Sequence, residues 1–279
     1  MNYELGRSFS SLNANGVART TGTSITHPFV LTREARLTGI AHYEHRWMDD
    51  NINSFDTHNN RELNVTNVAL AGSLYDKLLP AGGLTQAYAS VTAGSLYFTN
   101  QIAANADAAS GLNTNGGYHK FMWQLSRTQN LFGDNWGDIS LYSNFAGQVA
   151  SKNLDSSEQM SLGGPNAIRA YPVGEASADE AWLVNSEVRY GLPTFSGIPG
   201  QIQFISFIDT GGARINARAL AGQVNNSRHL TGYGFGINWL GLEGFNIRTS
   251  LAWRDVNTQP QSDPNQNSPQ GYFQITKSF

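Results

Sequence analysis

The sequence has no cysteine, few charged residues and no excess of positive charge. With no Cys among 279 residues, disulfide bonds, thiol nucleophiles and cysteine-ligated zinc sites are all excluded. Charged residues make up 14% of the chain, compared with about a quarter in ordinary globular proteins. The net charge of −3 offers no basic surface to nucleic acid, so we expect no nucleic-acid partner.

Leader, membrane-helix and catalytic signatures are missing as well. No stretch approaches the roughly 18 consecutive apolar residues that a transmembrane helix needs. Residues 1–12 lack a basic region followed by an apolar core, so no signal peptide is predicted. The sequence contains no G-x-S-x-G, no H-E-x-x-H and no phosphate-binding loop. We therefore predict no enzymatic activity, metal or cofactor; a hydrolase assembled from residues distant in sequence stays open, without a motif to support it.

Segments of alternating apolar and polar residues dominate the chain, and this period of two is typical of β-strands whose faces meet different media. In one clear example, Leu37, Tyr43 and Trp47 share one face, and Arg36 and Glu44 share the other. His42 and His45 also fall on opposite faces of this strand, so they form no metal pair. We expect about twelve strands, near residues 3–12, 17–29, 36–47, 61–76, 84–98, 118–131, 139–149, 182–192, 201–210, 232–239, 245–254 and 271–279.

The connections alternate in length. Those near residues 30, 80, 134, 196 and 242 are short, and those near 55, 108, 165, 220 and 263 are long. An outer-membrane β-barrel has short periplasmic turns, long outer loops, an apolar face toward lipid and a polar face toward a wet lumen. Aromatic residues near the strand ends would form the interfacial girdles: Trp47, Tyr75, Phe98, Trp182, Tyr190, Trp239 and Trp253. We predict an all-β transmembrane antiparallel barrel, with a soluble β-sandwich or propeller as the alternative.

One long connection, 152–180, differs from the others. Its central part, 161–179, is too rich in Gly, Pro and small polar residues to form a strand or helix. An unstructured loop of this length is usually functional rather than a spacer. Arg169 and Tyr171 stand at its centre, and we expect the loop to fold back into the cavity of the barrel.

Motifs in this loop and on a later strand resemble a known family. They are Asn153-Leu-Asp-Ser-Ser-Glu158, Leu162-Gly-Gly-Pro165, Ile168-Arg-Ala-Tyr-Pro172, Gly174-Glu175 and Phe207-Ile-Asp-Thr-Gly211. Together they resemble the two-partner secretion transporters, the TpsB branch of the Omp85 superfamily (ShlB/FhaC/HecB type). The resemblance covers essentially the whole chain, and the paired Arg-loop and Phe-x-Asp-x-Gly motifs are its specific part.

The resemblance implies a 16-stranded barrel preceded by periplasmic POTRA domains. Residues 1–279 would then be the last twelve strands, with POTRA domains and signal peptide absent, so that the chain is a fragment or a truncated product. The implied function is a Gram-negative outer-membrane pore that translocates, and so activates, a large secreted exoprotein such as a hemolysin or adhesin. The implied partners are that exoprotein, outer-membrane lipid and the barrel-assembly machinery, for which Phe279 would be the insertion signal.

The resemblance and the alternation together nominate site residues. Asp209 faces the lumen by alternation, and the resemblance places Arg169 at the inward loop tip, where a bidentate contact would hold the loop. The competing interpretation is that Arg169 is a solvated loop charge. The full loop-lock set is Arg169, Tyr171, Gly174, Glu175, Asp209 and Gly211. The expected lumen-lining residues are Glu187, Arg189, Arg248 and Arg254.

Two other functions stay open at this point. A passive diffusion porin would share the alternation and loop asymmetry, but not the Arg loop with its Phe-Ile-Asp-Thr-Gly partner. An Omp85-type assembly factor would share both motifs. The stretch 153–158 and the Ile-Arg-Ala-Tyr-Pro form favour secretion over assembly.

Overall fold

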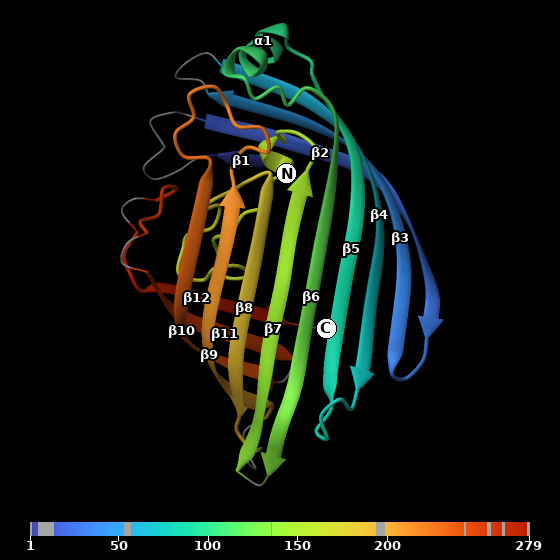
Figure 1. Cartoon of the computed structure of the whole chain (residues 1–279), viewed down its shortest axis with the longest axis vertical. Helices are drawn as coiled ribbons and strands as arrows, with labels where there is room; N and C mark the ends of the chain where they lie inside the picture. The colour runs from blue at the N-terminus through green and yellow to red at the C-terminus, as the bar shows by residue number, and fades with distance from the viewer. Residues whose placement is uncertain are drawn as a thin grey trace.

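The fold is a single antiparallel sheet in which each strand pairs with its neighbours in sequence, as Figure 1 shows. It is a computed structural model that describes residues 2–4, 14–52, 57–134, 136–193, 199–242, 244–255, 258–263 and 266–277. The 12-stranded sheet confirms the all-β class. Its strands are β1 (Asn2–Glu4), β2 (Ala14–Leu31), β3 (Ala35–Ile52), β4 (Thr57–Asp76), β5 (Gly83–Phe98), β6 (Gly116–Asp134), β7 (Gly137–Ala150), β8 (Glu180–Gly191), β9 (Gln201–Arg214), β10 (Ser227–Leu242), β11 (Phe245–Arg254) and β12 (Gln270–Lys277).

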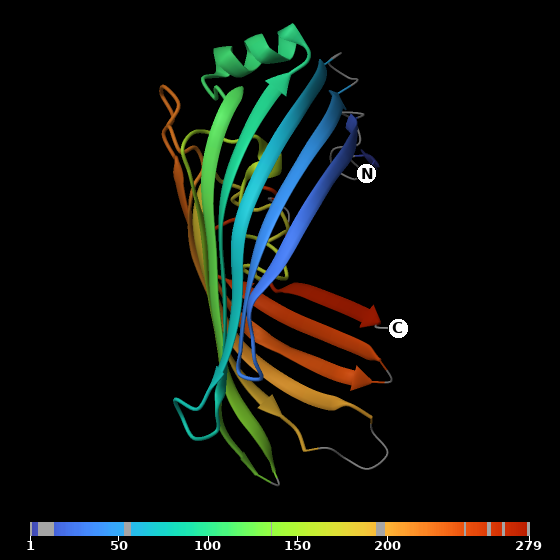
Figure 2. The ribbon, with the colours of Figure 1, turned by 90° about the vertical axis from the view of Figure 1, so that its right-hand side faces the viewer.

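The sheet curls strongly, and the connection between β7 and β8 lies on its concave side (Figure 2). The long strands β2 to β6 rise well above the ends of β8 to β12, and helix α1 (Gln101–Ser110) sits at the top. Within the described residues, β1 and β12 are the two edges of the sheet and no ladder joins them. The described strands thus form a curved wall around the loop.

The two faces of the sheet differ in chemistry. Large apolar side chains are exposed over the convex face, among them Ile25, Leu70, Val91, Leu125, Val188, Ile208, Phe235 and Leu251. The buried polar side chains of the concave face include Asn144, Gln148, Asn185 and Asp209. An apolar surface this extensive is costly in water, whereas lipid matches it. The alternation predicted from sequence is therefore confirmed, with the apolar residues outward. Among the described residues, no helix has both the length and the apolar character needed to cross a membrane.

The bounds predicted for the loop over 49–60 are wrong, because β3 extends to Ile52 and β4 begins at Thr57, and residues 53–56 lie outside the described residues. The polar composition suggested a loop, but ladder hydrogen bonds use the backbone and do not depend on side-chain polarity. The 20 residues of β4 span about 65 Å at roughly 3.3 Å per residue, well beyond an apolar band of about 25 Å. The polar ends of β3 and β4 therefore continue past the lipid-facing zone.

The loop predicted over 99–117 is also wrong, because it contains helix α1. The Asn100 side chain accepts a 2.8 Å hydrogen bond from the N–H of Ile102, and Gly111 ends the helix with a φ of 80°. These are standard N-terminal and C-terminal caps around an alanine-rich segment. Of the first predicted strand, 3–12, only residues 3 and 4 are described, as part of β1.

A small apolar cluster lies on the concave face near the top of the long strands. It consists of Met48, Leu63, Val65 and Leu96, with Phe98 packed against it. Phe98 was expected in an interfacial girdle, and this expectation is wrong. The strand register puts Phe98 opposite Arg61 on the inner face.

Candidate functional site

The connection between β7 and β8 is an ordered loop with its own internal hydrogen bonds. Its two limbs pair at Met160 and Ala178, whose N–H groups each donate to the other's carbonyl at 2.9 Å. Gly163 permits a close crossing, because an added Cβ there would lie 2.0 Å from the Pro172 carbonyl oxygen. Gly174 has a φ of 86°, which side chains disfavour. The glycines seen in the sequence are thus required for this shape.

The tip of the loop is held by one arginine. Arg169 donates from Nε to Asp209 Oδ2 at 2.8 Å and from Nη2 to Asp209 Oδ1 at 2.7 Å, and its backbone N–H adds a third bond to Oδ2 at 3.1 Å. Its Nη1 donates to Glu187 at 2.7 Å, and its guanidinium carbon lies 3.4 Å from the centroid of the Phe207 ring. Asp209 is fully buried and Arg169 is 7% exposed. Arg169 is therefore not a solvated loop charge.

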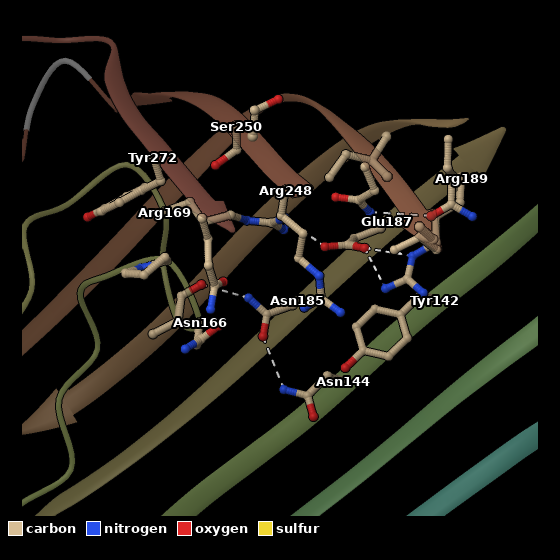
Figure 3. Close-up of a pocket in the computed structure, with 18 of the residues that line it drawn as sticks. Tyr142, Asn144, Asn166, Arg169, Asn185, Glu187, Arg189, Arg248, Ser250 and Tyr272 are labelled. Atoms are coloured by element: carbon tan, nitrogen blue, oxygen red, sulfur yellow. Dashed lines mark hydrogen bonds and ion pairs between the residues drawn. The ribbon is translucent and has the colours of Figure 1, made fainter. Parts of the chain in front are cut away.

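Neighbouring strands extend this contact into a network, which Figure 3 shows around its pocket. Glu187 on β8 also accepts from Arg189 at 2.7 Å, and Arg189 lies over the Tyr142 ring at 4.1 Å. Asn185 donates to Asp209 and to the Ala167 carbonyl, both at 2.8 Å. Sequence reasoning missed Asn185, although its position two residues before Glu187 placed it on the same inward face.

A polar cavity of about 360 Å³ lies beside the loop tip. Glu187, Arg189 and Arg248, which the alternation puts on the inward face, line this cavity. Arg254 does not line this cavity. Its guanidinium instead donates to Gln266 and Gln259 in the connection between β11 and β12. The alternation gave the face of Arg254 but could not show that a loop covers it.

Tyr171 and Glu175 join their loop to the β11–β12 connection, which sequence reasoning did not anticipate. Both residues are fully buried. Tyr171 donates its hydroxyl to the Thr258 carbonyl at 3.4 Å and accepts at its own carbonyl from Tyr272 at 2.8 Å. The carboxylate of Glu175 accepts from a set of donors outside its own loop: Arg228 (2.7 Å), the Gln261 N–H (3.0 Å), the Ser262 N–H (2.8 Å) and the Ser262 hydroxyl (2.6 Å).

Glu175→Gln is expected to loosen the β11–β12 connection. Burial acts to raise the pKa of Glu175, but hydrogen bonds from Ser262 and Gln261 and the charge of Arg228 outweigh it and lower the pKa. A lowered pKa means that the contact is fully present at neutral pH and is lost only as the pH falls through that lowered value. Faster amide exchange over 258–263 in Glu175→Gln at pH 7 would show the loosening. Glu180, a partly exposed carboxylate that pairs with Arg214 instead, is the control, and Glu180→Gln should leave exchange there unchanged. Unaltered exchange in both variants would contradict this role.

A second anchor holds the stem of the loop, and sequence reasoning missed it. The short 3₁₀ helix η3 (Ser156–Glu158) is capped by Asp155, whose side chain accepts from the Ser157 N–H at 3.0 Å. Asp155-Ser-Ser-Glu158, part of the motif that carries the family resemblance, thus forms a capped helical turn. Glu158 is 3% exposed and contacts Arg46 at 2.6 Å and Lys120 at 2.9 Å.

Glu158→Ala is expected to release the stem while the tip stays bound. The substitution leaves Arg46 and Lys120 without this carboxylate, and removing one partner of a buried ion pair costs roughly 3–5 kcal/mol. Limited proteolysis should cut 151–160 at least about tenfold faster than in the wild type. Asp76→Asn removes the carboxylate from a more exposed pair with Arg127, far from the loop, and serves as the control. Equal cleavage in wild type and Glu158→Ala would show that this anchor carries little of the docking energy.

Two glycines on the inner face of the sheet make room for the loop. A Cβ at Gly211 would lie 2.6 Å from the Trp182 carbonyl oxygen and 3.2 Å from the Ile168 side chain. A Cβ at Gly232 would lie 2.5 Å from the Ala170 Cβ. Gly211 was nominated from its motif, whereas Gly232 gave no sequence signal beyond a glycine inside a strand. Phe279 lies outside the described residues. The described part of the chain holds no group of three or more His, Asp or Glu side chains placed to bind a metal ion.

The chain matches the model of a known protein family. The model of the haemolysin secretion/activation protein family ShlB/FhaC/HecB matches residues 3–239. A heme/hemopexin transporter protein, HuxB of Haemophilus influenzae strain 86-028NP, is 30% identical over 260 residues, covering 90% of this chain and 43% of that protein. The chain therefore spans less than half the length of the curated relatives that it matches.

Solved structures of similar fold include two proteins named CdiB. The CdiB structure from Escherichia coli has a TM-score of 0.70 at 16% identity, covering 94% of this chain and 45% of its own. The structure from Acinetobacter baumannii has a TM-score of 0.64 at 15% identity, covering 98% and 44%. At these identities the likeness supports the fold alone.

Proposed function

Because the chain belongs to the ShlB/FhaC/HecB family of haemolysin secretion/activation proteins, we propose that it forms part of a non-enzymatic pore that exports a large secreted protein. The family consists of outer-membrane β-barrel proteins of Gram-negative bacteria, which places this chain in that membrane. Its members work with a secreted partner protein. We propose that residues 1–279 form the C-terminal part of the barrel of a longer translocator and contain the loop that regulates passage.

The observation that carries this proposal is the loop fixed inside the curved sheet by Arg169. A diffusion porin needs a permanently open lumen, whereas here the tip occupies the interior and is held by Asp209 and Glu187. A pinned loop beside a polar cavity is the arrangement expected of a conformational element that must both dock and release while a polypeptide passes, so that a loop unable to dock would impair export. The polar lining of Asn, Gln and Arg suits the hydrated backbone of an unfolded chain.

A secretion assay with the complete translocator and its secreted partner tests this function. When the translocator is removed, the partner protein is expected to be absent from the medium and to accumulate in the cell envelope. The amounts of unrelated outer-membrane barrels, measured in the same cells, should not change. A general fall in those barrels, with export affected only secondarily, would support an assembly factor instead.

A further inference from the structure

The convex face of the sheet carries a groove near the end from which the long loops emerge. The groove has a volume of about 520 Å³ and crosses β6 to β10. Five residues, one from each strand and opposite one another in the ladders, run along it: Trp123, Gly147, Trp182, Gly212 and His229. This volume lies within the range of about 300–1,000 Å³ that ligand sites occupy.

The two glycines shape the groove. A Cβ at Gly147 would lie 2.2 Å from the Trp123 ring, and a Cβ at Gly212 would lie 2.6 Å from Trp182 Nε1. Each indole therefore packs on the bare backbone of the next strand. Phe145 adds a third ring, 5.9 Å from Trp123 between centroids. The floor of the groove is consequently aromatic and apolar, and suits a hydrocarbon chain.

An ion pair beside the groove indicates how far the groove lies from the centre of the bilayer. Glu180 and Arg214 contact one another at 3.2 Å on the same face, two residues beyond Trp182 and Gly212 toward the long loops. Charges on the lipid-facing side are tolerated near the interface and are costly at the centre of the bilayer, and Trp favours the interface. In the other direction the exposed residues are apolar, such as Ile208 at 52%. The groove thus lies where the acyl chains of the outer leaflet meet their headgroups.

The rim of the groove offers donors for an anionic headgroup. The Arg214 side chain is 52% exposed despite its pair with Glu180, and His229 and Ser227 are exposed beside it. Glu180 is the one carboxylate among the residues that line the groove. Guanidinium and imidazolium groups bind phosphate oxygens through strong charge-assisted hydrogen bonds.

We propose that this groove binds a phosphate-bearing lipid of the outer leaflet. One acyl chain lies along the aromatic floor between Trp123 and Trp182, and the phosphate contacts Arg214 and His229. The site is on the outside of the sheet and does not depend on the transport role proposed for the loop. It would fix the height of β6 to β10 in the membrane, and β10 is the strand that supplies Arg228 to the loop contact.

Native mass spectrometry tests the site on the complete translocator, extracted from the membrane and purified in detergent. The probe is lipid A carrying both phosphates. The double variant Arg214→Gln/His229→Gln is expected to bind this lipid at least about tenfold more weakly than the wild type. Binding of uncharged diacylglycerol, which has acyl chains but no phosphate, should be the same in both proteins. Gly212→Leu, which displaces Trp182 and fills the groove, is expected to weaken retention of both lipids.

The matched control is Arg127→Gln. Arg127 lies on the same face at the opposite end of β6 and also pairs with a carboxylate, Asp76, at 2.8 Å. It should bind both lipids as the wild type does. Equal lipid A binding by the wild type and the double variant, or an equal loss in Arg127→Gln, would overturn the proposal.

Discussion

Arg169→Ala is expected to free the loop tip and to reduce export by the complete translocator at least about tenfold, with the barrel still inserted. The change leaves two buried carboxylates, those of Asp209 and Glu187, without their shared guanidinium. Breaking a buried ion pair by removing one partner costs about 3–5 kcal/mol, or a factor of roughly 150 to 5,000 in the docking equilibrium of the loop. The strand ladders lie outside this contact, so the barrel itself should assemble.

The amount of secreted partner protein in the medium reports export. The shift in gel mobility of the barrel on heating reports whether the barrel is folded. Arg169→Lys keeps the charge but loses the paired N–H donors to Asp209, so export should fall between that of alanine and wild type. Arg248→Gln, which removes a cavity-lining arginine without a contact to the loop tip among the described interactions, is the matched control and should export more than Arg169→Ala. Normal secretion by a folded Arg169→Ala translocator would rule out a role for the lock in transport.

Gly232→Ala is expected to have the next largest effect, because it places a methyl group where the loop rests. The added Cβ would lie 2.5 Å from the Ala170 Cβ, while its other nearest neighbours, the Ala170 nitrogen and Ile168 Cγ2, are at 3.4 and 3.5 Å. Overpacking of this kind costs about 1–3 kcal/mol, and here the loop must move because the strand is fixed by ladders on both sides. Export should fall several-fold without any change of charge.

A compensating change makes this prediction specific. Ala170→Gly removes the methyl group that the new side chain meets, so the double variant should recover much of the lost export. Gly72→Ala is the control, because a Cβ there meets nothing closer than 3.5 Å and the position is far from the loop. If Ala170→Gly does not improve Gly232→Ala, the defect comes from the strand and not from the docked loop.

The sequence was sufficient for those features that depend on local periodicity. Alternation in segments such as 118–131 and 201–210 identified the strands and their lipid-facing sides, since successive side chains of a strand must point to opposite faces. The unequal connections predict which end of the barrel faces outward, and the motifs around Arg169 and Asp209 identified the family. The same reasoning failed where the amino-acid composition of a segment did not match the secondary structure that the segment adopts. Residues 49–60 are polar but mostly strand, and 101–110 form a helix that two short caps define.

Only the tertiary structure decided which inward-facing groups meet. A period of two assigns a face but gives neither the curvature of the sheet nor the path of a loop across it. Glu158 reaches Arg46 across 112 positions of sequence, and Glu175 reaches Ser262 across 87. Arg254 faces inward as the alternation requires, yet it bonds to the β11–β12 connection instead of the cavity. Such contacts depend on where the folded loop and the curved sheet come together in space. Two charged or polar side chains attract one another strongly only when they are close, and the sequence does not give that separation.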